Sequence, residues 1–294
     1  MPAISTTFLA RTARERGYAV PAVNVFDEIS MRAVIDAAVR TSSPLIVQIS
    51  VKTVRSSGTA FITSLFQALT RDVEVPIALH LDHCPDRGVI DDVVSAGWSS
   101  VLFDASNRDF DTAERETGEV VTQAHAAGIA VESEIENILG VEDGVGSDHV
   151  ERAYSVETLA AVAERTGADL LAPQLGTSHG LFRSRPTLLP ERARELVSLT
   201  DRPIVLHGGT GLEPGEFQEF IAAGVSKINI STAVKNSYMR ASAEHLDWAR
   251  EHDEWDPPKL FAAIAAAVTD SIAEHIIWFG SEGKATRVAE AVAR

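Results

Sequence analysis

The segment 76-PIALHLDH-83 sets the pattern from which the fold can be inferred. Its first half is apolar, and its second half places Asp82 beside two histidines, His80 and His83. Two imidazoles and a carboxylate are costly to place beside a hydrophobic core unless something binds them or uses them. We therefore interpret the segment as a buried β-strand whose carboxyl end carries a functional site.

Seven further short apolar segments recur along the chain, each continuously apolar, as strands covered on both faces are. Helical patterns lie between most of them, and several end on a glycine that suits a helix C-terminus. Eight strands that alternate with helices in about 250 residues predict parallel strands in a closed (β/α)8 TIM barrel. The predicted strands are 19–25, 44–50, 76–83, 99–104, 129–134, 168–173, 203–207 and 225–230. The predicted helices are 28–41, 89–97, 111–128, 156–167, 190–200, 213–224 and 232–245.

Two predicted helices lie outside the repeat. A short helix over 4–16 precedes the first strand, and an added helix over 257–279 has an apolar face that could pack on the barrel or on another subunit. No linker or change in composition divides residues 1–294, so we expect a single barrel domain. A doubly wound open sheet uses the same strand–helix alternation and is the alternative; the count of eight strands favours the barrel.

The composition is that of an ordinary globular protein, with 45% hydrophobic and 23% charged residues among 294. A net charge of −16 argues against a nucleic acid or an anionic membrane as partner, although a local pocket could still bind an anionic substrate. The single cysteine, Cys84, excludes a disulfide within the chain. The N-terminus lacks the apolar core of a signal peptide, and we expect that no apolar run approaches the ~18 residues of a membrane helix. We expect a soluble, cytoplasmic protein.

Titratable side chains gather at the predicted strand ends, where barrels of this kind form their active sites. His83, His179 and His207 follow three different strands, and three imidazoles with an open fourth position are typical of a catalytic zinc ion. Asp104 and Glu134 end the strands between and could hold a second cation. A single histidine at a strand end is more often a hydrogen-bonded structural residue than a ligand, so the prediction depends on the joint placement.

The other histidines have structural interpretations. His80 lies two residues before Asp82. We expect it to have a structural role in the barrel, and the alternative is that it supports a metal ligand. Cys84 is expected to be a small buried residue. Five histidines in predicted helices or a loop are expected to be solvated or packed: His125, His149, His245, His252 and His275.

A glycine-rich turn, 208-GGTG-211, follows His207, and the segment 229-NIST-232 leads into a predicted helix. Backbone N–H groups of such a turn, together with a helix N-terminus, form an anion site. Barrels often bind phosphate at the loops after strands seven and eight. The sequence therefore predicts a phosphorylated substrate.

Taken in order, these motifs resemble the class II, zinc-dependent ketose-bisphosphate aldolases, a family that includes fructose-bisphosphate and tagatose-bisphosphate aldolases. The resemblance covers nearly the whole chain. It begins at 20-VPAVNVFDEISMRAVIDAA-38, continues through HLDH, VLFDAS, GTSHGL, IVLHGGTGL and KINIST, and ends at 279-FGSEGKA-285.

The resemblance implies the roles of the site residues. His83, His179 and His207 would hold one catalytic Zn2+, and Asp104 and Glu134 match positions for a second or displaced metal; a second divalent or a monovalent cation could join the zinc. Asp82 matches the acid/base that hands a proton to the acceptor aldehyde oxygen, and Glu142 matches the mobile-loop glutamate that moves the proton of the ketose carbon. The residues expected to bind substrate, dihydroxyacetone phosphate above all, are Asn24, Ser50, Gly180, Gly208, Gly209, Thr210, Asn229, Ile230, Ser231 and Thr232.

The implied reaction is the reversible aldol cleavage of a phosphorylated ketose, with dihydroxyacetone phosphate or a close analogue as donor and a zinc-stabilised enediolate as intermediate. A homodimer or homotetramer is also implied. The chain departs from the family at 134-EIENILGVED-143, which has one glycine where the family is glycine-rich, and at 173-PQL-175, where the family has small apolar residues. Thr210 stands where serine is commoner. An aldolase with an atypical substrate is therefore one alternative.

Two rival functions use the same barrel. A non-catalytic subunit that supports another aldolase would be expected to lose metal ligands, whereas all three histidines and Asp82 are present. A metal-dependent hydrolase typically carries His-x-His on its first strand, and here that strand is AVPAVNV.

Overall fold

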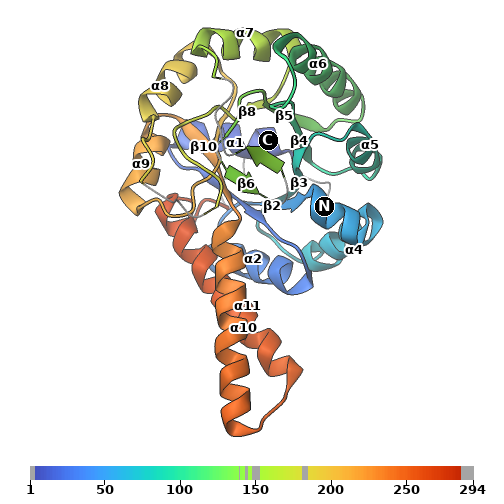
Figure 1. Cartoon of the computed structure of the whole chain (residues 1–294), viewed down its shortest axis with the longest axis vertical. Coiled ribbons are helices and arrows are strands. Elements are labelled where there is room, and N and C mark those ends of the chain that lie inside the picture. The colour runs from blue at the N-terminus through green and yellow to red at the C-terminus, as the bar shows by residue number, and fades with distance from the viewer. Residues whose placement is uncertain (1–3, 139, 143–144, 148–152, 181–184, 286–294) are drawn as a thin grey trace.

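The structure is a computed structural model that describes residues 4–138, 140–142, 145–147, 153–180 and 185–285; the side chains of 141, 142 and 145–147 lie outside the description. Eight parallel strands close into a barrel in the order β1-β10-β9-β8-β5-β4-β3-β2, with helices around it (Figure 1). The predicted (β/α)8 barrel is confirmed. The strands are β1 Val20–Asn24, β2 Leu45–Ser50, β3 Ile77–Cys84, β4 Ser100–Asp104, β5 Ala130–Glu134, β8 Leu170–Leu171, β9 Ile204–Leu206 and β10 Val225–Ile230.

The helices between the strands agree with the sequence patterns except after β2, where no helix was expected. There the chain forms α3 and α4, and the hydroxyl of Ser50 accepts a hydrogen bond from the backbone N–H of Thr53 to cap α3. The helices around the barrel are α2 Glu28–Arg40, α3 Val51–Ser57, α4 Thr59–Thr70, α5 Arg87–Ser95, α6 Phe110–Ala126, α7 Val156–Thr166, α8 Pro190–Leu199 and α9 Pro214–Ala222. A short antiparallel hairpin after β5, formed by β6 Gly140–Glu142 and β7 Val145–Ser147, was also not expected.

Helix α1 (Thr6–Arg16) covers the N-terminal end of the barrel. The helix predicted over 4–16 is therefore confirmed, with its start two residues later. Its buried Leu9 and Ala13 pack in one apolar cluster with Val20, Ile46 and Ala78 of three strands. This packing closes one end of the barrel, which leaves the carboxyl ends of the strands as the place for a site.

The C-terminal helices α10 (Thr232–His252) and α11 (Pro257–Trp278) run side by side and project away from the barrel (Figure 1). We refer to this helix pair as the arm. One face of α11 is buried, where α11 packs against α2, and includes Ile264, Val268 and Ile272. The 22 residues of α11 have a mean hydropathy of 1.5 over their most apolar window, long and apolar enough to cross a membrane by length and composition alone. The expectation that no apolar run approaches ~18 residues was therefore wrong by this measure. Asp270 and Glu274 interrupt the continuous apolar run, although the helix is apolar on average.

Candidate active site and metal centre

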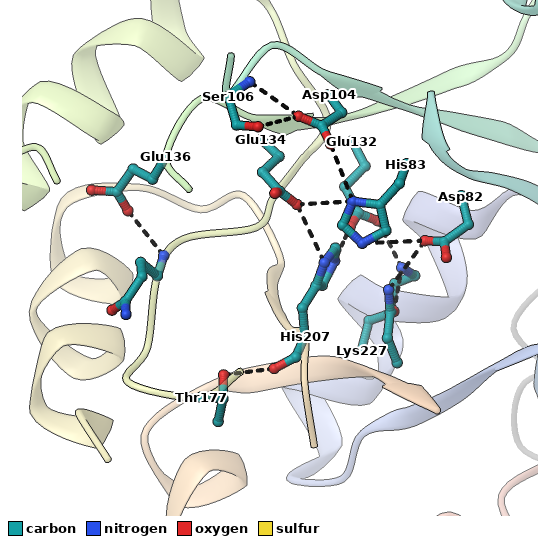
Figure 2. Close-up of polar contacts among 12 residues, drawn as sticks. Asp82, His83, Asp104, Ser106, Glu132, Glu134, Glu136, Thr177, His207 and Lys227 are labelled. Carbon is teal, nitrogen blue, oxygen red and sulfur yellow. Dashed lines mark hydrogen bonds and ion pairs between the residues drawn. The ribbon is translucent and has the colours of Figure 1, made fainter. Parts of the chain in front are cut away.

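The end of β3 carries Asp82 and His83 next to each other, although adjacent residues of a regular strand face opposite sides. The register of β3 against β4 shifts between Leu81 and Cys84, so β3 has one extra residue there. His83 has φ 41°, in the left-handed region. Such a bulge re-aims a side chain. It brings Asp82 Oδ1 to 4.0 Å from His83 Nε2, so both side chains face the same site (Figure 2).

Three histidines meet at this end of the barrel, as the sequence predicted. His179 follows β8 and His207 follows β9, and each offers a ring nitrogen within 4.8 Å of one on His83. All three side chains are buried. The ring centroid of His83 lies 4.8 Å from that of His179 and 4.7 Å from that of His207. Residues at or after the ends of three separate strands thus form one cluster.

Two carboxylates complete the cluster. Asp104 and Glu134 are partners in the register of β4 and β5, so they leave the barrel side by side. Asp104 Oδ2 and Glu134 Oε2 each lie 3.4 Å from His83 Nδ1, and Glu134 Oε2 also lies 3.3 Å from His207 Nδ1 (Figure 2). With His83 they form a second group whose atoms are close enough to share an ion.

The donor set fits a metal ion. Within the described part of the chain, His207 Nδ1 and both ring nitrogens of His179 are buried without a hydrogen-bond partner. Burial lowers the pKa of His179 well below its ordinary value, which keeps a lone pair available. Burial alone would also lower the pKa of His83, but Glu134 and Asp82 raise it well above the ordinary value. A divalent cation would relieve both conditions, because it satisfies the orphan nitrogens and replaces a proton at His83.

A buried polar network, which the sequence patterns did not reveal, lies beneath the cluster. Glu132 Oε1 accepts a hydrogen bond from His207 Nε2 at 2.9 Å, and Lys227 Nζ lies 2.8 Å from Glu132 Oε2. Lys227 also donates to Asn229, whose amide nitrogen lies 3.3 Å from Asp82 Oδ1. Lys227, a charged residue inside the predicted buried strand 225–230, was the available signal.

Asp82 is held as a carboxylate by its surroundings. Burial alone would raise its pKa, but His83, His207 and Lys227 hold the pKa below the ordinary value. Asn24 Nδ2 donates to Asp82 Oδ2 at 2.7 Å. An ionised Asp82 can accept a proton. His80 lies deeper, with Nδ1 2.7 Å from Ser100 Oγ, and burial lowers the pKa of His80 to about 3.

The predicted anion-binding segments lie beside His207. Gly208 has φ 66°, and a Cβ there would lie 2.4 Å from the carbonyl oxygen of Ser178, so only glycine allows this close approach. The hydroxyl of Ser231, at the N-terminus of α10, is buried and has no hydrogen-bond partner in the described chain. The other predicted residues of these segments are placed in the loops after β8 and β9, at the end of β10 and at the start of α10: Gly180, Gly209, Thr210, Asn229, Ile230 and Thr232.

Asn24 borders a cavity of about 450 Å³ between β1, α3 and α10. Lys52 and Lys235 line it, together with Thr53 and Ser56, and the rest of its lining is largely apolar. Ser50, another residue predicted to bind substrate, ends β2 just before α3. The cavity therefore adjoins the Asp82 side of the site, because Asn24 contacts both.

Glu142 and the segment around it can be placed only in part. Its backbone belongs to β6, and its side chain lies outside the described residues, as does His149. Glu136 lies at the start of this segment, and the sequence patterns did not identify it as a site residue. Its buried carboxylate accepts hydrogen bonds from the backbone N–H of Tyr154 and Gln174 at 2.6 and 2.9 Å, and from Arg192 at 2.7 Å.

Comparisons with known proteins agree with this geometry. The sequence profile of the family "Fructose-bisphosphate aldolase class-II" matches residues 4–284. A Bacillus subtilis (strain 168) protein named "Probable fructose-bisphosphate aldolase" is 35% identical over 97% of this chain and 100% of its own length. The "Sulfofructosephosphate aldolase" of Alkalicoccus urumqiensis is 31% identical over 97% of this chain and 99% of its own. The crystal structure of the YdjI aldolase from Escherichia coli K12 has a TM-score of 0.84 at 28% identity and covers 97% of this chain and 100% of its own.

Both the profile and the relatives span nearly the whole chain. The strand-end histidines and carboxylates that the sequence singled out all fall within the matched residues. The chain belongs to the class II fructose-bisphosphate aldolase family and is therefore an aldolase, a carbon–carbon lyase.

Proposed function

We propose that the enzyme cleaves a phosphorylated ketose reversibly, with dihydroxyacetone phosphate or a close analogue as the donor product and with Zn2+ at the three-histidine cluster. The observation that carries the proposal is the cluster itself: three buried imidazoles at or after the ends of three strands. Ring nitrogens of His179 and His207 have no hydrogen-bond partner among the described residues. A bound zinc ion would supply the Lewis acidity that stabilises the enediolate charge. Asp104 and Glu134 are the candidates for a second or displaced cation.

Asp82 is proposed as the acid/base at the sugar hydroxyl. Its low pKa makes it a carboxylate near neutral pH, so it can accept the hydroxyl proton when the carbon–carbon bond breaks and return that proton in condensation. Its two oxygens accept amide hydrogen bonds from Asn24 and Asn229, which fix its orientation. Glu142 is proposed for the proton at the ketose carbon, on the family resemblance alone.

The donor phosphate is proposed to lie at the glycine turn and the N-terminus of α10. Backbone N–H groups at a helix N-terminus favour an anion, and the buried hydroxyl of Ser231 lacks a partner within the described chain. Gly208 and Gly209 let the backbone approach closely.

An anionic group at the far end of the substrate is proposed to enter the cavity that Asn24 borders. Lys52 and Lys235 supply positive charge there on a chain whose net charge is −16. The names of two relatives, fructose-bisphosphate aldolase and sulfofructosephosphate aldolase, both describe a fructose with two anionic groups. A cytoplasmic location, a single domain and a homo-oligomer remain predictions.

Alanine variants of the metal cluster test the proposal. Purified protein should contain about one zinc per chain and lose the cleavage of ketose bisphosphates in a chelator. His83→Ala and His207→Ala should lose both zinc and activity, because each removes one of three ligands. Asp82→Ala should keep its zinc and lose turnover, by ~10²-fold or more. Zinc content by atomic absorption and cleavage rates across ketose mono- and bisphosphates are the measurements.

Two results would contradict the proposal. Cleavage at the wild-type rate by Asp82→Ala would remove the acid/base assignment. Wild-type protein that takes up no zinc and cleaves no ketose phosphate would favour a non-catalytic barrel.

A further inference from the structure

Lys227 and Glu132 form an ion pair inside the barrel, with Nζ and Oε2 2.8 Å apart and both side chains fully buried. They come from β10 and β5, which β9 and β8 separate in the barrel, so the pair spans the barrel interior. Burying two charges is costly, and apolar residues of similar volume are often as stable. Stability alone therefore does not explain the pair, and its other contacts indicate a further role.

Glu132 acts on the metal side of the site. Its Oε1 accepts the Nε2–H of His207 at 2.9 Å, and this contact fixes which ring nitrogen carries the hydrogen. Nδ1 of His207 is then left with its lone pair toward His83 and Glu134 (Figure 2). A carboxylate that orients a histidine in this way commonly strengthens metal binding.

Lys227 acts on the Asp82 side as well. Its Nζ donates a hydrogen bond to Asn229 Oδ1 at 2.8 Å. Because this ammonium group can only donate, the amide oxygen of Asn229 must face Lys227, and its Nδ2 then faces Asp82 Oδ1. One ammonium group thus contacts the partner of a candidate metal ligand and the partner of the candidate acid/base.

We infer that Lys227 is a positioning residue that orients His207 through Glu132 and Asp82 through Asn229, so that metal affinity and proton transfer depend on one buried side chain. The inference deepens the proposed function and rests on it for the role of Asp82. The His207 half requires only that the three-histidine cluster binds a divalent ion.

Gln48 provides the matched control. It is equally buried, and its Nε2 donates to Asn24 Oδ1 at 2.9 Å, so it fixes the second amide that donates to Asp82. Among the described residues, Gln48 has no contact with His207 or Glu132 like that of Lys227. Gln48 therefore reaches Asp82 but not the metal cluster.

Substituting both residues by the same apolar side chain separates the two effects. Zinc affinity of the purified full-length apoprotein is measured by chelator competition. The visible spectrum of the cobalt(II) form reports the ligand field of the metal. The kcat is measured at saturating zinc with the ketose phosphate that the wild type cleaves fastest. Lys227→Met should weaken zinc binding ~10- to 100-fold, change the cobalt spectrum and lower kcat. Gln48→Met should lower kcat and leave zinc affinity and the cobalt spectrum as in the wild type.

Glu132→Gln and the double variant Lys227→Met/Glu132→Gln guard against a folding failure, since the double variant buries no unpaired charge. Both should bind zinc more weakly than the wild type. The inference would be overturned if Lys227→Met or the double variant kept the zinc affinity and the cobalt spectrum of the wild type. This holds even if the apoprotein unfolded more easily, because that combination would indicate a purely structural role for Lys227. A wild type that binds zinc but cleaves no ketose phosphate would defeat the proposed function and leave the zinc comparison valid.

Discussion

At the scale of single residues, Cys84 shows how sharply the environment changes along β3. It follows His83 directly, yet its thiol is buried in the hydrophobic core and donates to the carbonyl oxygen of Asp86 at 3.2 Å. Burial raises the pKa of Cys84 to about 12. The thiolate is the reactive form, so this cysteine should be inert at neutral pH.

Thiol titration tests this expectation. At pH 8 the native protein should react with a disulfide reagent at least ~100-fold more slowly than the protein unfolded in guanidinium, because native Cys84 is both buried and protonated. The reaction is followed by absorbance with one thiol per chain. Equal rates in the native and unfolded protein would show that the thiol is accessible.

Residue chemistry also marks how far the sequence alone could go. The three histidines could be predicted because His83 ends one apolar strand, His207 directly follows another and His179 lies in the loop after a third. Strand ends and the loops after them converge in any parallel barrel. The partnership of Lys227 and Glu132 could not, because it depends on which strands face each other across the barrel interior. A single lysine in a strand gives no indication of its partner without that closed geometry.

At the scale of elements, β3 illustrates a second limit. Its existence followed from composition, but strict alternation would have placed Asp82 and His83 on opposite faces. The extra residue between Leu81 and Cys84 that turns them to one site leaves no local signature in the sequence. Helices α3 and α4 were missed for a related reason, since segment 51–70 is rich in Thr, Ser and Val, which favour helices weakly.

The contact made by Glu136 links four elements, because it follows β5 and binds the chain just before α7, just after β8 and within α8. The segment that carries Glu142 begins and ends at this contact. Glu136→Ala should lower the free energy of unfolding by about 2–4 kcal/mol, since it leaves Arg192 and two backbone N–H groups without their acceptor. Urea denaturation measures the loss.

Glu119→Ala is the control for Glu136→Ala. Glu119 forms ion pairs with Arg87 and Arg115 on the surface, with about half of its side chain exposed. Exposed pairs contribute roughly 0–1 kcal/mol, so the denaturation midpoint should hardly move. Similar losses in the two variants would mean that Glu136 is no more than another surface-type contact.

At the scale of the whole molecule, the arm bears several large apolar side chains that its own barrel does not cover. The exposed ones are Met239, Leu246, Trp248, Trp255, Phe261 and Ile277. Most lie on helices that project from the barrel (Figure 1), so the barrel itself leaves them exposed. We propose that a second copy of the chain covers them, because symmetric homodimers are the commonest assemblies of soluble proteins.

Sedimentation equilibrium distinguishes the outcomes, since one chain has a mass of 31.6 kDa. The wild type should sediment as a dimer or tetramer, and Trp255→Ser/Phe261→Ser should shift it toward the monomer by weakening association ~10-fold or more. Phe61→Ser, which removes an equally exposed aromatic ring from α4, should leave the assembly unchanged. A monomeric wild type at micromolar concentration would refute the dimer.

The pairing of β1 with β10 has a consequence for biosynthesis. One edge of β1 pairs with β10, in the register Val20–Lys227. This edge therefore stays unpaired during synthesis until the ribosome has extruded most of the polypeptide, including β10. Chaperones that shield nascent chains should therefore engage this enzyme early and release it late, and translation arrested before codon 225 should yield insoluble fragments.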